Sequence, residues 1–430
     1  MNGFEFYTIV LENYWVYIFV LLGVSLPYIY IGQRYTHTWA DPLRFNLLTN
    51  VFVTAVPVFL FIKGFIPIET GIYFLIAQSV FWVAFIIPAT KYINFSKKVL
   101  INETEIAYWL YIIFLFLYVL SISITYIVLG IPLFRESRLD TYTNSGLGVL
   151  GRMLPFLQIY CIFYSFYLWR SVKKLSLNKL IVIFSFILFF VTGILSGSRS
   201  SIFIFIFTYW AFCYFYLRNT GIIAKYYKFL FLGIGISIMT FTLKADSKDM
   251  YTGLIGFLSR VISSGDTFYM AFPNDVWKQI QTGPWFNHLF YGFFGPLRLI
   301  SGEGMPPAVG FQLTWIVNPS LYGQSTGPLS SPQLLGLLYF GWGGIFFSFI
   351  MGLFVSIMIY RIPSLLPKGL ISSIVATYLY FQASALILDS CLGMASLFDT
   401  ILNLIILFLT IFLINKFIDF IKAQKVSIII

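Results

Sequence analysis

Charged residues are scarce in this chain. Only 10% of its 430 residues are Asp, Glu, Lys or Arg, and 59% are hydrophobic, whereas soluble domains carry roughly 25% charged residues. Apolar runs recur along the sequence, and each is long enough to cross a hydrocarbon core of ~30 Å. The composition therefore predicts an all-α integral membrane protein that crosses the bilayer many times.

Histidine, cysteine and the common catalytic motifs are also scarce. The two histidines, His37 and His288, are too few for a histidine metal cluster, and the three cysteines lie in or beside apolar segments. No HExxH, Gly-x-Ser-x-Gly, P-loop or GxGxxG motif stands in a suitable context. Asp246 and Asp249 flank Lys248, which is more typical of a solvated segment than of a metal site. We therefore expect neither a metal nor a cofactor.

The apolar runs predict eleven membrane spans. They cover about residues 14–31, 46–62, 71–90, 106–130, 150–169, 180–196, 201–217, 227–243, 333–360, 370–388 and 397–414. No cleavable signal peptide is expected, because the first basic residue, Arg34, follows the first apolar run.

The connections between these spans alternate in charge. Most of the 27 basic residues fall on one side, at Arg34, Arg44, Lys91, Lys97, Lys98, Arg170, Lys173, Lys174, Lys179, Arg218, Lys225, Lys228, Arg361, Lys368, Lys416, Lys422 and Lys425. The positive-inside rule makes that side cytoplasmic, with the N-terminus outside and the C-terminus in the cytoplasm. The net charge of +11 is thus a topology signal that favours anionic inner-leaflet lipid, and we expect no nucleic acid.

One long connection dominates the predicted outer face. It divides the chain into helices 1–8 over residues 1–243, an external loop or cap over 244–332, and helices 9–11 with a short cytoplasmic tail over 333–430. Long connections tend to be functional. This one is rich in aromatic residues and Gly-Pro turns, and short amphipathic helices are expected over 253–262 and 275–281.

Six arginines are predicted on the outer face. They are Arg135, Arg138, Arg152, Arg199, Arg260 and Arg298. Guanidinium groups suit diphosphates, because their planar fork donates paired hydrogen bonds and stays charged. Arg199 lies in "SGSRSS", whose small residues could open the next helix at an anion-favouring N-terminus. The alternative for each arginine is a contact with lipid headgroups, and it is favoured for Arg135, Arg138 and Arg152.

Candidates for a general base also lie on this face. His288 is the one predicted external histidine and could titrate near neutral pH, although a surface histidine among aromatic residues is the commoner case. The external loop also offers carboxylates that could accept a sugar hydroxyl proton, namely Asp266, Asp275 and Glu303. Asp389 and Asp399 bracket the last external turn. An acid within the membrane suggests a function, although Asp399 could instead cap a helix or pair within the bundle.

The "SGSRSS" patch between two mid-chain helices, followed by one large external loop, resembles the O-antigen polymerases, which are oligosaccharide repeat-unit polymerases. Three further stretches add to the resemblance: "GIPLFRESRLDTYTNSGLGVLGRML" (130–154), "SRVISSGDTFYMAFPN" (259–274) and "GPLSSPQLLGLLYFGWGG" (327–344). By this resemblance, Arg199 matches the family's Gly-Ser-Arg element, Arg152 ends a Gly-x-x-x-Arg segment, and Arg260 and Arg298 match arginines of the large loop.

The resemblance implies a metal-independent glycosyltransferase of the bacterial cytoplasmic (inner) membrane. Such an enzyme polymerises undecaprenyl-diphosphate-linked oligosaccharide units for lipopolysaccharide or another polysaccharide, and it works beside membrane lipid, a chain-length regulator and a flippase. Asp266 or His288 would then serve as the base, while Arg199, Arg260, Arg298 and Arg152 would bind the diphosphate.

Other functions stay open at this point. A flippase or another transporter is the alternative from a different class, although the spans are nearly free of charge and no internal repeat is evident. An O-antigen ligase would share the architecture and the chemistry. A purely structural scaffold would not need so many polar, Gly and Pro residues in its external loop.

Overall fold

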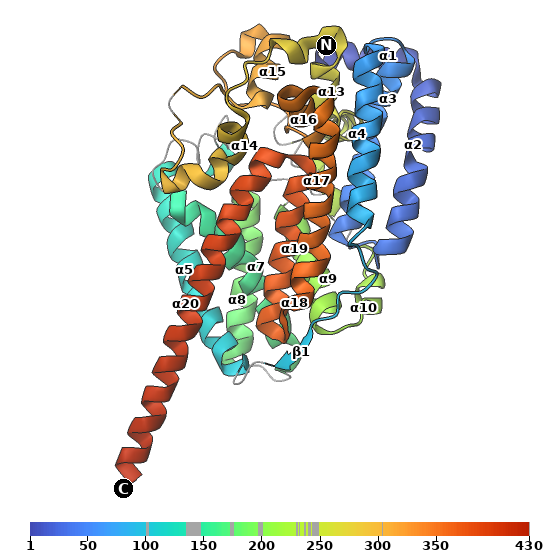
Figure 1. Ribbon diagram of the computed structural model, residues 1–430. Helices are drawn as coiled ribbons and strands as arrows, with labels where there is room; N and C mark the ends of the chain where they lie inside the picture. Colours follow the sequence, from blue (N-terminus) through green and yellow to red (C-terminus); the bar gives the residue numbers. More distant parts are fainter. Residues whose placement is uncertain are drawn as a thin grey trace. The chain divides into compact units, whose positions relative to one another are not determined.

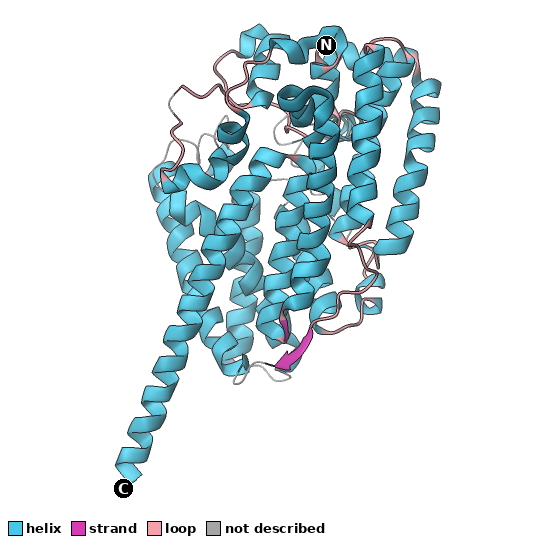
Figure 2. Cartoon of the chain, in the orientation of Figure 1, coloured by secondary structure: helices cyan, strands magenta, loops and turns pink. Residues whose placement is uncertain are grey.

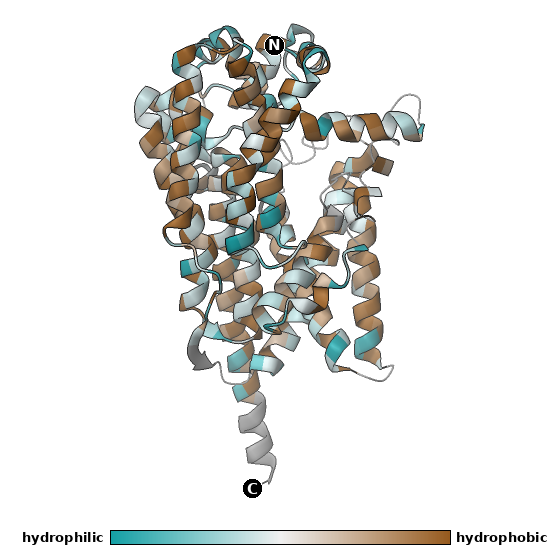
Figure 3. Ribbon diagram, turned by 90° about the vertical axis from the view of Figure 1, so that its right-hand side faces the viewer, coloured by the Kyte–Doolittle hydropathy of each residue, from teal (hydrophilic) through white to brown (hydrophobic). Residues whose placement is uncertain are grey.

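The chain folds almost entirely into helices (Figure 2). The computed structural model describes all residues except 100–102, 135–147, 173–175, 197–200, 229–230, 232, 236–237, 240–241, 243–248, 303 and 430. Within this described part, eight helices are long and apolar enough to cross a membrane, and hydrophobic residues cover much of their length (Figure 3). The protein is therefore an all-α, multi-pass membrane protein, as the composition predicts.

The eight candidate spans each overlap a span predicted from the sequence. They are Tyr14–Tyr35, Pro42–Ile62, Ile68–Ile86, Glu103–Phe134, Leu177–Leu195, Pro332–Leu365, Leu370–Leu388 and Ser390–Phe420. The span predicted over 150–169 lies in a helix that carries Arg152 and Arg170, and the one over 201–217 forms a shorter apolar helix, Phe203–Tyr216. The span over 227–243 is interrupted by residues outside the described part. The count of eleven and the orientation stay predictions.

Two compact units make up the chain. The first unit comprises residues 1–93, 220–362 and 380–396, and the second comprises residues 94–219, 363–379 and 397–430. The external loop predicted over 244–332 belongs wholly to the first unit. The three-part division into helices, cap and helices follows membrane topology and stays a prediction.

The first unit contains most of the short helices. Its elements are α1 (Gly3–Glu12), α2 (Tyr14–Tyr35), α3 (Pro42–Ile62), α4 (Ile68–Ile86), α10 (Gly221–Ala224), α12 (Met250–Ile262), α13 (Asp266–Ala271), η3 (Pro273–Gln279), α14 (Trp285–Phe294), η4 (Gly295–Leu297), α15 (Val309–Val317), η5 (Pro319–Leu321), α16 (Pro332–Phe340), η6 (Gly341–Gly343), α17 (Gly344–Ser356) and η7 (Ile357–Arg361). Figure 1 labels α1 to α4, α10 and α13 to α17.

The second unit contains longer helices and a small sheet. Its elements are β1 (Ser96–Val99), α5 (Glu103–Leu129), η1 (Pro132–Phe134), α7 (Gly148–Ser171), α8 (Leu177–Leu195), α9 (Ser201–Ala211), η2 (Phe212–Tyr216) and β2 (Pro367–Lys368). Three helices, α18 (Ile362–Leu365), α19 (Leu370–Leu388) and α20 (Ser390–Ile429), contribute to both units. The strands β1 and β2 pair in parallel.

Glycines allow α4 to pack closely against α17 in the first unit. A Cβ atom at Gly352 would lie 2.1 Å from the carbonyl oxygen of Phe81. A Cβ atom at Gly344 would lie 2.3 Å from the hydroxyl of Tyr73 and from the carbonyl carbon of Gly336. Small residues at such contacts let helix backbones approach in a membrane, where dispersion replaces the hydrophobic effect between spans.

The two short helices expected in the external loop have different outcomes. The helix expected over 253–262 is confirmed as α12, which begins at the N-cap Asp249, whose carboxylate accepts from the amide of Thr252. In place of the α-helix expected over 275–281, the chain forms the 3₁₀ helix η3 over Pro273–Gln279, which has the same length but begins two residues earlier. Asn274 and Asp275 take left-handed backbone angles there, with φ of 55° and 52°, and these interrupt regular α-helix.

Candidate functional site

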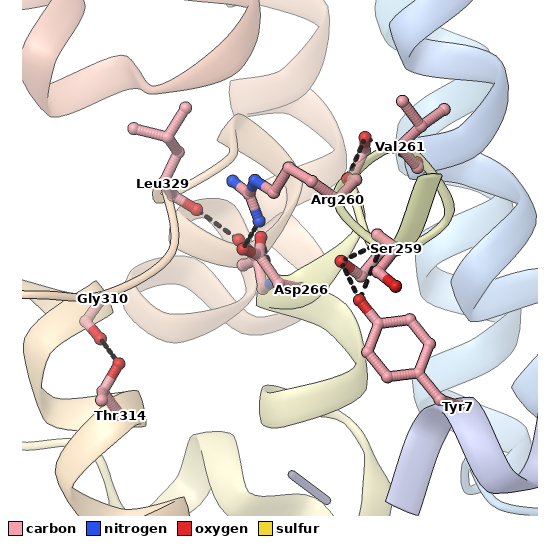
Figure 4. Close-up of polar contacts among 11 residues, drawn as sticks. Tyr7, Ser259, Arg260, Val261, Asp266, Gly310, Thr314 and Leu329 are labelled. Carbon is pink, nitrogen blue, oxygen red and sulfur yellow. Dashed lines mark hydrogen bonds and ion pairs between the residues drawn. The ribbon is translucent and has the colours of Figure 1, made fainter. Parts of the chain in front are cut away.

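A tight turn between α12 and α13 brings Arg260, a predicted anion-binding residue, next to Asp266, a predicted base. Arg260 lies in the last turn of α12, and Asp266 opens α13 after the turn residues 263–265. The Nη1 atom of Arg260 donates to Oδ2 of Asp266 at 2.5 Å (Figure 4). Because the turn reverses the chain, two residues six positions apart form one ion pair.

Neighbouring elements hold this turn in place. The Tyr7 hydroxyl donates to the Ser259 carbonyl at 2.8 Å and lies 2.9 Å from the Ser263 hydroxyl (Figure 4). The hydroxyl of Thr267 donates to the carbonyl of Leu329. A Cβ atom at Gly265 would lie 2.8 Å from the Cβ atom of Val56 in α3, so glycine permits this close approach. The turn that carries the pair is therefore held from three directions, while the Arg260 side chain itself stays 51% exposed.

The ion pair lines a recess in the first unit. The recess is small, with a volume of about 50 Å³. It is bounded by Asn50, Val53, Arg260, Ser264, Gly265, Asp266, Thr267, Phe268, Leu329, Ser331, Gln333, Ile387 and Leu388. The Arg260 side chain is 51% exposed, whereas that of Asp266 is 13% exposed. The cation thus reaches solvent while its counter-ion is largely enclosed.

The ion pair between Arg260 and Asp266 sets the electrostatics of the recess. The nearby Asp266 carboxylate raises the pKa of Arg260, so the guanidinium stays charged at any working pH. Asp266 accepts from Arg260 through Oδ2 and from the amide of Thr267 through Oδ1, at 3.0 Å. An incoming anion could take the place of Asp266 on Arg260, and this exchange would release the carboxylate to accept a proton.

The other predicted base, His288, lies elsewhere in the first unit. It belongs to α14, and its Nδ1 atom hydrogen-bonds with the hydroxyl of Tyr339 in α16. Burial lowers the pKa of His288, so the ring is neutral at pH 7. His288 is not among the residues that line the recess. The structure therefore unites Asp266 with Arg260 but does not bring His288 to them.

The remaining loop candidates are dispersed. Arg298 is exposed at the end of η4, in a left-handed conformation with φ of 57°, and it does not line the recess. Asp275 is paired, since its Oδ2 accepts from Lys278 at 2.6 Å and its Oδ1 from the indole of Trp277 at 3.1 Å. Several predicted residues lie outside the described part of the chain, namely Arg135, Arg138, Arg199, Asp246, Lys248 and Glu303.

Arg152 is paired within the second unit. Its Nη1 atom donates to Oδ1 of Asp399 at 2.5 Å, which is the pairing within the bundle that the sequence left open for Asp399. Its guanidinium carbon lies 5.3 Å from the ring centre of Phe398. The carbonyl of Arg152 accepts from the side-chain amide of Asn403 at 3.2 Å. Its role as a diphosphate ligand stays a prediction.

Asp389 has a structural role in the first unit. Its Oδ2 accepts from the amide of Ser330 at 2.8 Å, and its Oδ1 accepts from the amide of Leu392 at 2.9 Å, near the start of α20. The bond from Leu392 satisfies a donor in the first turn of α20, and the bond from Ser330 ties this turn to the loop before α16. They also fix the loop that brings Leu329 and Ser331 to the recess.

Sequence reasoning missed five polar residues of the recess, namely Asn50, Ser264, Thr267, Ser331 and Gln333. Asn50 comes from α3, and Ser331 and Gln333 come from the start of α16. Two signals were present: Ser331 precedes Pro332, a typical N-cap pattern, and Asn50 follows Asn46 by four residues in an apolar span. The second pattern puts both amides on one helix face.

The described residues contain no group of three or more His, Cys, Asp or Glu side chains that could hold a metal ion. The chain matches no family model, no curated protein and no solved structure.

Proposed function

We propose that this protein is a membrane glycosyltransferase that polymerises undecaprenyl-diphosphate-linked oligosaccharide units on the outer face of a bacterial cytoplasmic membrane. The observation that carries the proposal is the Arg260–Asp266 pair at the mouth of its recess. It offers a permanent cation and a carboxylate together, and it lies in the loop segment that resembles the polymerases. The reaction needs both groups.

The proposed reaction moves the growing chain onto the incoming unit. An acceptor sugar hydroxyl attacks the anomeric carbon of the growing chain, and the bond from that carbon to the lipid diphosphate breaks. The diphosphate leaves with the bonding electrons, and Arg260 neutralises the charge that develops on it. The hydroxyl proton goes to the Asp266 carboxylate, which the diphosphate has displaced from Arg260. This route uses no metal ion.

The other predicted residues have supporting roles in this proposal. In this proposal Arg199 is a further diphosphate ligand, as the family resemblance implies, whereas Arg298 attracts the diphosphate at long range. Arg152, which pairs with Asp399 within the second unit, stabilises the bundle. His288 is the alternative base, and the pKa shift that keeps its ring neutral supports such a role. Because Nδ1 of His288 contacts Tyr339, the other ring nitrogen, Nε2, would have to face the hydroxyl of the acceptor sugar.

Reconstitution with a synthetic lipid-linked repeat unit tests the proposal. Proteoliposomes that contain the protein should convert this substrate into a ladder of polymers on a gel, and a chelator should not reduce the ladder. Arg260→Ala and Arg199→Ala should each abolish it. Passage of the unit across the bilayer without a ladder would establish the transporter alternative. Transfer of a preformed chain only to a lipid A–core acceptor would establish the ligase.

A further inference from the structure

A second concave site lies between α2 and α3 of the first unit, which run side by side (Figure 1). This α2–α3 groove has a volume of about 400 Å³. It is lined by Leu21, Leu22, Ser25, Tyr28, Ile29, Gly32, Gln33, Arg44, Leu47, Leu48, Val51 and Phe52. The proposed transfer reaction does not use it.

The groove is as long as one membrane leaflet is thick. Its lining on α2 extends from Leu21 to Gln33, which is about 18 Å along a helix that rises 1.5 Å per residue. A bilayer core of ~30 Å gives each leaflet about half that thickness. Both helices are candidate spans. A hydrocarbon chain that enters the groove from one leaflet would therefore fill it from end to end.

In the middle of the groove, the hydroxyls of Ser25 and Tyr28 form hydrogen bonds within the protein. The hydroxyl of Ser25 donates to the carbonyl of Leu22 at 2.7 Å. The hydroxyl of Tyr28 turns to the hydroxyl of Thr54, at 2.7 Å, and accepts from the amide of Gln78, also at 2.7 Å. Because these groups are satisfied within the protein, the surface left to an occupant is apolar.

One end of the groove carries a fixed cation, Arg44. Its Nε atom donates to the hydroxyl of Thr36 at 3.0 Å, and that hydroxyl donates to the carbonyl of Gly32 at 2.5 Å. Asp41 is near Arg44 in sequence, but its carboxylate oxygens accept hydrogen bonds from the hydroxyl of Tyr380 and from the backbone amides of His37 and Leu43. Within the described part of the chain, no carboxylate lies within ion-pair distance of Arg44. Other guanidinium donors remain for an outside acceptor.

We propose that the α2–α3 groove binds one anionic phospholipid, with an acyl chain along the groove and the phosphate on Arg44. The charge complements a phosphate at the level where a lipid headgroup lies, one leaflet from the inner end of the groove. A second copy of this chain suits the groove less well, because a docked apolar helix would bury Arg44 without an acceptor. The predicted topology puts this lipid in the cytoplasmic leaflet.

Native mass spectrometry of the full-length protein tests the site. The delipidated protein in a neutral detergent is titrated with phosphatidylglycerol or with phosphatidylcholine. We expect one phosphatidylglycerol to bind about tenfold more tightly than phosphatidylcholine, because the choline cation offsets the attraction between its neighbouring phosphate and Arg44, whereas phosphatidylglycerol keeps a net negative charge. Arg44→Gln should abolish this preference. The matched control is Arg34→Gln, which removes a nearby exposed cation outside the groove and should retain it.

A second variant, which fills the groove, tests the proposal independently in case Arg44→Gln fails to fold. A Cβ atom at Gly32 would meet only Leu47 Cδ1, at an ordinary 3.7 Å, so Gly32→Leu should fold and block the groove. It should lose the bound phosphatidylglycerol. Equal binding of the two lipids by the wild type, or retention of the anionic lipid by Gly32→Leu, would overturn the proposal. A dimer that Gly32→Leu disrupts would identify a second copy as the occupant and would also overturn it.

Discussion

The protein uses the same ion pair, arginine with aspartate at 2.5 Å, in two different settings. In the first unit, Arg260 and Asp266 lie six residues apart across one turn, and the guanidinium is 51% exposed. In the second unit, Arg152 and Asp399 are separated by 247 residues and join α7 to α20, with exposures of 29% and 22%. Asn403 and Phe398 add further contacts to the second pair.

This difference shows that distance alone does not define the role of an ion pair. An exposed pair across a local turn adds little stability, so its members can exchange partners when an anion arrives. A more enclosed pair between distant segments costs more to break, because each partner loses its compensation for desolvation. We infer that the first pair serves binding and that the second pair serves structure.

The largest expected effect is the loss of polymerisation activity when the first pair is broken. Arg260→Ala should lower polymerisation in proteoliposomes about 10²-fold or more, since one donor at a developing negative charge contributes about 2.7–4 kcal/mol. Its stability should change by less than about 1 kcal/mol, because the pair is exposed. Arg260→Lys should recover part of the rate, since lysine keeps the charge but loses the fork. Ladder formation by Arg260→Ala at the wild-type rate would refute this role.

The next effect is on stability. Arg152→Ala should lower the free energy of unfolding by about 2 kcal/mol, less than the 3–5 kcal/mol of a fully buried pair because both side chains are partly exposed. Chemical unfolding in mixed micelles measures this change in the free energy of unfolding. The exchanged variant with Arg152→Asp and Asp399→Arg should regain part of this loss. An exchange no more stable than Arg152→Ala would show that the pairing itself contributes nothing.

Asp41 is a third carboxylate that sharpens the comparison, because it is buried and, among the described residues, has no arginine within ion-pair distance. Burial is the main cause that raises the pKa of Asp41 from 3.8 to about 6. The folded state then holds a proton that the unfolded state has released, so stability should fall as the pH rises from about 4 to about 6. Asp41→Asn should remove this slope in melting measurements across that range. The same slope in both proteins would exclude Asp41 as its source.

The smallest expected effect concerns Arg298, which is exposed and does not line the recess. Arg298→Ala should lower polymerisation by about threefold or less, because a solvent-screened charge contributes only long-range attraction. The loss should disappear in high salt. A loss as large as that of Arg260→Ala would place Arg298 in direct contact with the diphosphate.

The sequence was sufficient for the membrane class and for the segments that become candidate spans, because a bilayer demands long apolar helices wherever the chain crosses. It also identified Arg260 and Asp266, but as separate candidates. Their pairing depends on the reversal at Gly265, which fits against Val56 of α3. The contribution of Gln333 and Leu388 to the same recess depends on contacts far apart in the chain. No local pattern in a single sequence encodes such contacts.

The central claim is that an anion displaces Asp266 from Arg260, and equilibrium binding of inorganic pyrophosphate tests it most directly. Calorimetry on the purified protein should show binding that Arg260→Ala abolishes and that Asp266→Asn tightens, by about tenfold, because the internal competitor has lost its charge. Arg152→Ala should bind as the wild type does. Weaker binding by Asp266→Asn, or loss of binding in Arg152→Ala but not in Arg260→Ala, would contradict the account.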